Sequence, residues 1–287
     1  MPSPLTRRAF LGASLLAAAG VAGCGSKPPA PTPETSSALS EVTETAEVTE
    51  VTALPGTTGA SASMLPPHAY DEMSPSDFGT HLDGIVDSVP TVPGQRTVAL
   101  TFDACGGDYD AHLIEMLRSH GVPATLFLAK PWIDAHPDLT RELAADPLFQ
   151  LENHGTRHVP LSVSGHAAYG IHGTANAAEA IEEIAGNATA LERFGVRSTW
   201  FRAGTAHYDD VAVRIANDAG MRVAGFSVNG DFGASAGAFQ VAQQIQHAPD
   251  GAVVLMHMNH PHSETAAGVE QALEAMAGHT RFVTLGL

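Results

Sequence analysis

The 287-residue sequence predicts an α/β fold built on a parallel sheet. Short apolar runs with strand character, such as Ala124–Leu128, alternate with longer runs that have helical apolar spacing, such as Ala175–Phe194. Polar residues suited to catalysis also recur directly after the apolar runs, where parallel α/β proteins carry their sites. The alternation predicts six to eight strands, and spacing alone allows either an open sheet or a closed or nearly closed barrel.

The first half of the folded region contains three expected strands and two expected helices. Asp110 is expected to cap the first helix, and Gly121 is expected to end it. In order, the elements are a strand over Val98–Phe102, a helix over Ala111–His120, a strand over Ala124–Leu128, a helix over Leu139–Ala145 and a strand over Phe149–Leu151.

The second half continues the alternation. Gly195 and Gly220 follow two of its helical runs, at positions typical of a helix end. The expected helices cover Ala175–Phe194, Asp210–Ala219, Val241–His247 and Val269–Ala277. The expected strands cover Thr199–Phe201, Arg222–Val228, Ala252–Met256 and Phe282–Leu285.

The N-terminus has the pattern of a secretion signal. A twin-arginine pair precedes an apolar stretch from Leu11 to Val21, and residues 21–24 match a lipobox that ends in Cys24. The stretch is too short to span a bilayer reliably. We therefore expect residues 1–23 to be a twin-arginine lipoprotein signal peptide and Cys24 to be lipidated. The mature protein is then extracytoplasmic and anchored to a membrane by that lipid.

Composition divides the rest of the chain into two parts. The segment after Cys24 is rich in Pro, Thr, Ser, Ala and Glu, so residues 24–75 are expected to form a disordered tether. Residues 76–287, about 200 residues, are enough for one domain with a full core, which we expect to be a monomer. The formal net charge of −17 argues against a nucleic-acid partner and against electrostatic attachment to anionic lipid.

Polar residues at predicted strand ends form the candidate site. A carboxylate and a histidine pair spaced four residues apart are typical of a metal-assisted hydrolase, since neutral imidazole suits zinc and similar divalent ions. The candidate residues are Asp103, His154, His158, Arg202, Asp231 and His257.

The candidate residues lie in five motifs, which are TFDACGG at 101–107, ENHGTRH at 152–158, RAGTA at 202–206, GFSVNGDFG at 225–233 and VVLMHMN at 253–259. In their order, these motifs resemble those of the polysaccharide deacetylase (NodB-homology) family over essentially the whole of residues 97–287. The resemblance implies a distorted (β/α) barrel of about seven parallel strands. It also implies a divalent metal, expected to be zinc, held in part by His154 and His158.

The resemblance further implies a role for each retained residue. Asp103 is expected to be the general base and Arg202 to orient it. His257 is expected to protonate the leaving group, with Asp231 as its neighbouring carboxylate. A backbone N–H, that of Thr205, is the candidate for holding the oxyanion. The substrate implied is an acetylated polysaccharide or oligosaccharide, from which N-acetyl groups of N-acetylglucosamine units are removed.

One metal ligand of the family pattern is missing. The family carries a second aspartate directly after the first, and this chain has Ala104 there. Three residues remain candidates for the missing metal ligand, namely Asp108, Asp103 itself, or Cys105 as a thiolate. The first two are favoured over the third. The alternative to an enzyme is a catalytically silent glycan-binding module on the same fold.

Overall fold

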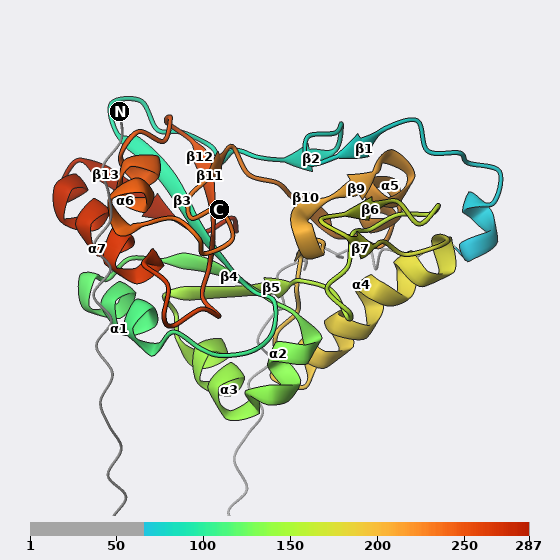
Figure 1. Cartoon of the computed structure of the whole chain (residues 1–287), viewed down its shortest axis with the longest axis horizontal. Helices are drawn as coiled ribbons and strands as arrows, with labels where there is room; N and C mark the ends of the chain where they lie inside the picture. Colours follow the sequence, from blue (N-terminus) through green and yellow to red (C-terminus); the bar gives the residue numbers. More distant parts are fainter. Residues whose placement is uncertain (1–65, 287) are drawn as a thin grey trace, which may run out of the picture. The chain divides into compact units, whose positions relative to one another are not determined.

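Nine parallel strands form the central sheet of the structure, a computed structural model that describes residues 66–286 (Figure 1). Eight of the strands follow one another in a single row, and the ninth, β13 (Thr280–Val283), pairs with the first part of β3 outside that row. In spatial order, these eight are β11 (Val228–Asn229), β12 (Ala252–His257), β3 (Arg96–Ala104), β4 (Ala124–Leu128), β5 (Phe149–Asn153), β8 (Trp200–Phe201), β10 (Arg222–Ala224) and β2 (Ile85–Val86). The expected α/β fold with a parallel sheet is confirmed.

The sheet curls into a distorted (β/α) barrel. β10 and β11 lie near opposite ends of the strand order, yet only three residues separate them in the sequence. Because a linker of this length spans at most about 14 Å, the two ends of the sheet must approach each other. An isolated bridge between Ser88, just after β2, and Ala252 of β12 joins them again.

This crossing corrects one predicted element. A single strand was expected over Arg222–Val228, but the chain leaves the sheet at Gly225 and rejoins it three residues later. Gly225 packs closely on β2, because a Cβ there would lie 2.6 Å from a methyl group of Ile85, and its N–H donates to the Val86 carbonyl at 2.8 Å. The local apolar pattern does not reveal a change of sheet position.

Helices cover the outside of the barrel. The cap expected at Asp110 is present, since its carboxylate accepts a 3.0 Å bond from the Leu113 N–H, and Gly121 ends the helix in the left-handed region. The helices are α1 (Ala111–His120), α2 (Lys130–Ala135), α3 (Pro137–Ala145), α4 (Ala177–Glu192), α5 (Asp210–Asp218), α6 (Ala238–Gln246) and α7 (Thr265–Met276). Of these, α2 was not expected from the sequence.

Short elements complete the structure. The two described 3-10 helices are η1 (Pro67–Tyr70) and η2 (Gly204–Ala206). Two antiparallel pairs join β1 (Phe78–Gly79) to β9 (Tyr208–Asp209) and β6 (Ala167–Ala168) to β7 (Ile171–His172). Among residues 66–286, no helix is both long and apolar enough to cross a membrane.

The first described residues pack on the domain. Tyr70 is only 2% exposed, it joins the apolar cluster that contains residues of α4 and α5, and its hydroxyl donates to Asp218 at 3.0 Å. Residues around Tyr70, within the segment expected to be a disordered tether, are therefore held by the fold. The predicted signal peptide and the lipidation site at Cys24 lie outside the described residues.

Candidate active site

The end of β3 carries the first motif. Side chains alternate along the strand, so that Ala104 packs with Phe102 in the main apolar core, whereas Asp103 and Cys105 line a cavity of about 430 Å³. The position of the missing aspartate therefore faces the core. Cys105 lies on the same side of the strand as Asp103.

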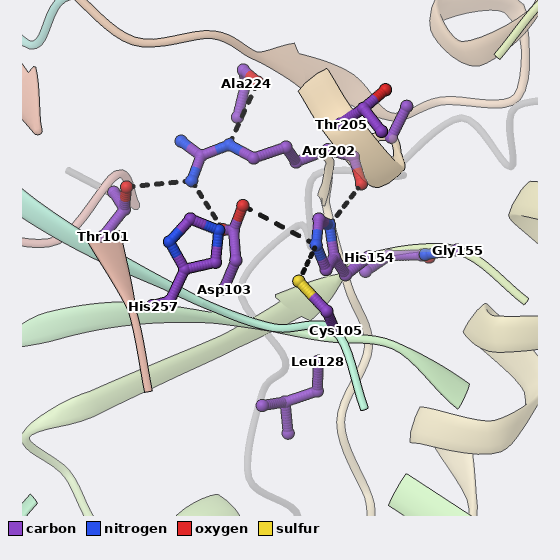
Figure 2. Close-up of polar contacts among 12 residues, drawn as sticks. Thr101, Asp103, Cys105, Leu128, His154, Gly155, Arg202, Thr205, Ala224 and His257 are labelled. Carbon is purple, nitrogen blue, oxygen red and sulfur yellow. Dashed lines mark hydrogen bonds and ion pairs between the residues drawn. The ribbon is translucent and has the colours of Figure 1, made fainter. Parts of the chain in front are cut away.

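A buried arginine fixes Asp103 (Figure 2). Arg202 Nη1 donates to Asp103 Oδ1 at 2.8 Å and to Thr101 Oγ1 at 2.9 Å, while Nη2 donates to the Gly225 carbonyl at 2.9 Å. The guanidinium also lies over the ring of Phe127, 4.2 Å from its centroid. Burial alone would raise the pKa of Asp103, but the charge and hydrogen bond of Arg202, together with the charges of His154 and His257, lower this pKa below its ordinary value. Asp103 is therefore ionised and positioned.

Cys105, His154 and His158 form one cluster. Their ligand atoms all lie within 4.8 Å of one another, and Cys105 Sγ is 3.7 Å from His154 Nε2. His154 Nδ1–H donates a 2.8 Å hydrogen bond to the carbonyl of Arg202, so Nε2 is the nitrogen that faces the cluster. His158 Nε2 is buried and has no hydrogen-bond partner among the described residues.

The predicted ligand Asp108 is not brought into this cluster. Its side chain is exposed on the loop after β3, and its carbonyl accepts a 2.9 Å bond from Trp132 Nε1. Asp103 Oδ2 lies 3.6 Å from His154 Nε2, on the margin of the cluster, while its other oxygen is held by Arg202. Of the three candidates for the missing metal ligand, the geometry favours Cys105.

The neighbouring histidines affect the protonation state of the Cys105 thiol. Burial raises the pKa of Cys105, but the neighbouring imidazoles of His154, His158 and His257 together outweigh burial and lower it well below the ordinary value. In return, burial lowers the pKa of His154, but the negative charges of Asp103 and Cys105 raise it overall. The cluster therefore favours a thiolate.

A buried glutamate that the sequence analysis missed holds the loop of His158. Glu183 of α4 accepts 3.0 Å bonds from the backbone N–H groups of Arg157 and His158. His158 itself has a φ of 59°, and Gly204 lies so close to it that a Cβ on Gly204 would be 2.3 Å from the His158 carbonyl carbon. The available signal was a charged residue on the apolar face of a helix, next to Ile184.

The second part of the site lies on the neighbouring strand. His257 ends β12 directly opposite Asp103 of β3 in the strand register. Its Nδ1 is 2.9 Å from Asp231 Oδ1, and its backbone N–H donates to Asp231 Oδ2 at 2.7 Å. Burial would lower the pKa of His257, but the hydrogen bond and charge of Asp231, together with Cys105 and Asp103, raise it well above the ordinary value. This imidazole is therefore suited to donate a proton.

Thr205 lines the same cavity. It lies in η2 with a φ of 69°, a strained backbone conformation for a residue other than glycine. Its Oγ1 is buried and has no partner among residues 66–286. The structure thus brings Thr205 to one cavity with Asp103, Cys105, His158 and His257.

Comparison with known proteins finds a matching family model and a curated relative. Residues 91–224 match the family model described as polysaccharide deacetylase, a span that contains both histidines of the cluster and Arg202 but ends before Asp231 and His257. The curated Bacillus subtilis protein YlxY, described as uncharacterized, is 23% identical over 175 residues. The match covers 60% of this chain and 51% of the relative, so the chain spans about half the length of that protein.

Solved structures agree on the architecture. A CE4 family pseudoenzyme from Bacillus anthracis has a TM-score of 0.56 at 21% identity, with 68% of this chain and 65% of that chain covered. Peptidoglycan deacetylase PdaC from Bacillus subtilis has a TM-score of 0.54 at 21% identity, with 68% and 90% covered. These similarities show the fold, which is the (β/α) barrel of the CE4 deacetylases.

Proposed function

Starting from the match of residues 91–224 to the polysaccharide deacetylase family, we propose that this protein is a metal-dependent hydrolase that cleaves acetyl C–N bonds on a polysaccharide. One observation carries the proposal. An arginine-held carboxylate, a Cys-His-His cluster and a histidine–aspartate pair converge on one cavity. A general base, a metal site and a general acid are the parts that metal-assisted amide hydrolysis requires.

The residues present fit a divalent metal, and zinc suits this set of donors. Zinc accepts thiolate and imidazole ligands, and catalytic zinc sites commonly use three protein ligands with an open fourth position. The unpartnered buried Nε2 of His158 and the Nδ1–H of His154 bound to a carbonyl are both typical of imidazoles that ligate metal. Cys105 would complete the set. The chemistry that such a metal supplies when bound is polarisation of the acetyl carbonyl and activation of water.

The remaining groups of the chain handle the protons. Asp103, held in place by Arg202, accepts the proton of the attacking water. The backbone N–H of Thr205 donates to the oxyanion that develops on the acetyl carbonyl. His257, kept protonated by Asp231, gives its proton to the departing amine. Base and acid lie on adjacent strands, so one bound acetyl group can reach both.

The proposed substrate is a polysaccharide with N-acetylglucosamine units in the cell envelope or outside the cell. A similar structure is described as a peptidoglycan N-acetylglucosamine deacetylase, at 20% identity and a TM-score of 0.57. We also propose that the protein acts outside the cytoplasm, anchored by lipid at Cys24. The support for this location is the lipobox-like sequence at residues 21–24.

A silent glycan-binding module is the second candidate. It is favoured by the loss of the second aspartate at Ala104 and by the similarity to a protein described as a pseudoenzyme. The two candidates differ in one measurable property, because only the enzyme releases acetate.

The test is acetate release from N-acetylglucosamine oligomers by the purified protein, with zinc or cobalt supplied. We expect turnover and close to one bound divalent ion per chain. Asp103→Asn should lower kcat by about 10²–10⁴-fold, the usual contribution of a general base, and leave glycan affinity largely intact. Asp108→Asn is the matched control, since Asp108 is exposed and outside the cluster. No acetate with either metal would exclude the enzyme.

A further inference from the structure

The tip of the β6–β7 hairpin is built from an unusual residue pair. Ala168 pairs with Ile171, so Tyr169 and Gly170 alone form the turn, with φ values of 53° and 78°. Positive φ at both turn positions defines a type I′ hairpin, for which Asn-Gly is the preferred pair. Tyrosine is a strained choice at the first position, because its Cβ disfavours the left-handed region.

Tyr169 gains little packing in return for this strain. Its side chain is 83% exposed, and its described aromatic contact is an edge-on contact with His207 at 5.3 Å between ring centroids. A large exposed aromatic ring on a strained backbone contributes little to folding stability. Such a combination is typical of a binding position.

The ring lines the candidate active-site cavity. Tyr169 lines the same cavity as Asp103 and His257, although it comes from a hairpin between β5 and α4 (Figure 1). Phe232 lines the cavity too, and it is also exposed, at 45%, with a φ of 54°. Two exposed aromatic rings in strained backbone conformations therefore border the groups proposed for catalysis.

The chemistry of the cavity indicates the ligand. Aromatic faces stack on the C–H faces of pyranose rings, and neither Lys nor Arg is among the described residues that line the cavity. A uronic acid or phosphorylated chain would need such cations for recognition. The lining therefore suits a neutral sugar chain.

We propose that Tyr169 is a substrate-positioning residue that stacks on a neutral hexosamine unit adjoining the acetylated one. The inference rests on the proposed deacetylase function and adds that the enzyme prefers an oligomer over a single acetylated sugar. The ring acts on the extent of binding and takes no part in proton transfer.

Tyr169→Asn is the decisive variant, because it creates the preferred Asn-Gly turn and removes only the ring. We expect its melting temperature to equal or exceed that of the wild type. Its KM for an N-acetylglucosamine pentamer should rise by about tenfold, the order expected from losing one stacking contact. Its kcat/KM for a small acetylated compound such as p-nitrophenyl acetate should not change.

Two further variants serve as controls. Tyr169→Phe keeps the ring and should keep the wild-type KM for the pentamer. Phe239→Ala removes another exposed aromatic, 74% accessible on α6 and outside the cavity lining, and should change neither kinetic constant. An unchanged pentamer KM in Tyr169→Asn, or an equal loss on both substrates, would overturn the inference while leaving the proposed function standing.

Direct binding separates this inference from the proposed function. If the wild type releases no acetate, calorimetric titration with the same pentamer still applies. Tighter pentamer binding by the wild type than by Tyr169→Asn would support the positioning role on a silent module. Equal binding by the two proteins, or none by the wild type, would overturn it.

Discussion

Cys105 changes the character of the proposed metal site at the level of single atoms. The family pattern has a carboxylate after the base, whereas here a thiolate from the next pocket-facing position joins two imidazoles. Thiolate is a softer ligand than carboxylate, so the site should prefer zinc or cobalt over magnesium, calcium or manganese. This preference follows from strand alternation, which points Ala104 into the core.

Cobalt substitution tests this ligand set directly. Cobalt bound by the wild type should show a near-ultraviolet sulfur-to-metal charge-transfer band, because a thiolate contacts the ion. Cys105→Ser should lose the band and bind cobalt at least about tenfold more weakly, since even residues that only support metal ligands contribute 10–100-fold. Asp108→Asn should keep both the band and the affinity. The opposite pattern in these two variants would assign the ligand to Asp108.

At the level of secondary structure, one helix controls the position of a metal ligand. The turn that carries His158 has few bonds of its own and is held by the Glu183 carboxylate of α4. The carboxylate also lies 3.3 Å from Arg157 Nε, an ion pair that supports the same turn. The geometry of the proposed metal site therefore depends on a residue that never touches the metal.

Replacement of that carboxylate should weaken metal binding. Glu183→Gln is nearly isosteric, but it can put an amide NH2 in place of Oε2, which accepts bonds from the backbone N–H and Nε of Arg157, so the loop loses these bonds and the ion pair. We expect zinc affinity to fall by about 10–100-fold and the melting temperature to fall by a few degrees. Competition with a chelating dye measures the affinity, and Glu183→Asp should restore part of it.

Glu179→Gln provides the matched comparison. Glu179 lies one turn earlier on α4 and contacts the Arg157 side chain at 3.1 Å, but it does not bond the backbone of the loop. Its loss should leave zinc affinity unchanged. Equal weakening by both substitutions would mean that charge near Arg157, and not the hold on the backbone, matters.

The sequence predicted elements well where local signals were complete. The helix after Asp110 and the strand over Ala124–Leu128 have the expected bounds, because a cap, a glycine stop and a wholly buried apolar run act locally. The β6–β7 hairpin was missed because Tyr-Gly is not the usual type I′ pair. Glu183 was missed because its partners lie in a distant loop, which no helical pattern reveals.

In the candidate site, too, the features that depend on local sequence were predicted and those that depend on the path of a loop were not. Strand ends predicted Asp103 and His257 as members of one site, since parallel strands finish at one edge of a sheet. The structure places the two residues opposite each other. Which residue takes the place of the missing aspartate depends on how the chain turns after β3. The sequence analysis favoured Asp108 over Cys105 as the metal ligand, because the sequence does not show that the loop after β3 leaves Asp108 exposed.

At the level of the whole molecule, the segment before the barrel contributes to its stability. Tyr70 fills a site in the cluster packed with α4 and α5, about 150 residues away in the sequence from its hydrogen-bond partner Asp218. The N-terminal part of the described chain is thus tied to the outer helices of the barrel. A fragment that starts at residue 76 would lack this anchor.

Two substitutions separate the packing of Tyr70 from its hydrogen bond. Tyr70→Ala should lower the free energy of unfolding by about 3 kcal/mol, as expected for an aromatic side chain removed from a core. Tyr70→Phe should cost only about 1 kcal/mol, the worth of one hydrogen bond. Urea unfolding measures both. A value near zero for Tyr70→Ala would show that the segment does not pack in solution.

The pairing of β3 with β12 has a consequence for how this protein can evolve. Asp103 and His257 face each other across a continuous backbone ladder, so their separation is set by the sheet. Tyr169 sits on a hairpin outside that ladder. A lineage can therefore lengthen, delete or exchange the hairpin, and with it the proposed sugar contact, while inheriting the proposed proton-transfer pair unaltered.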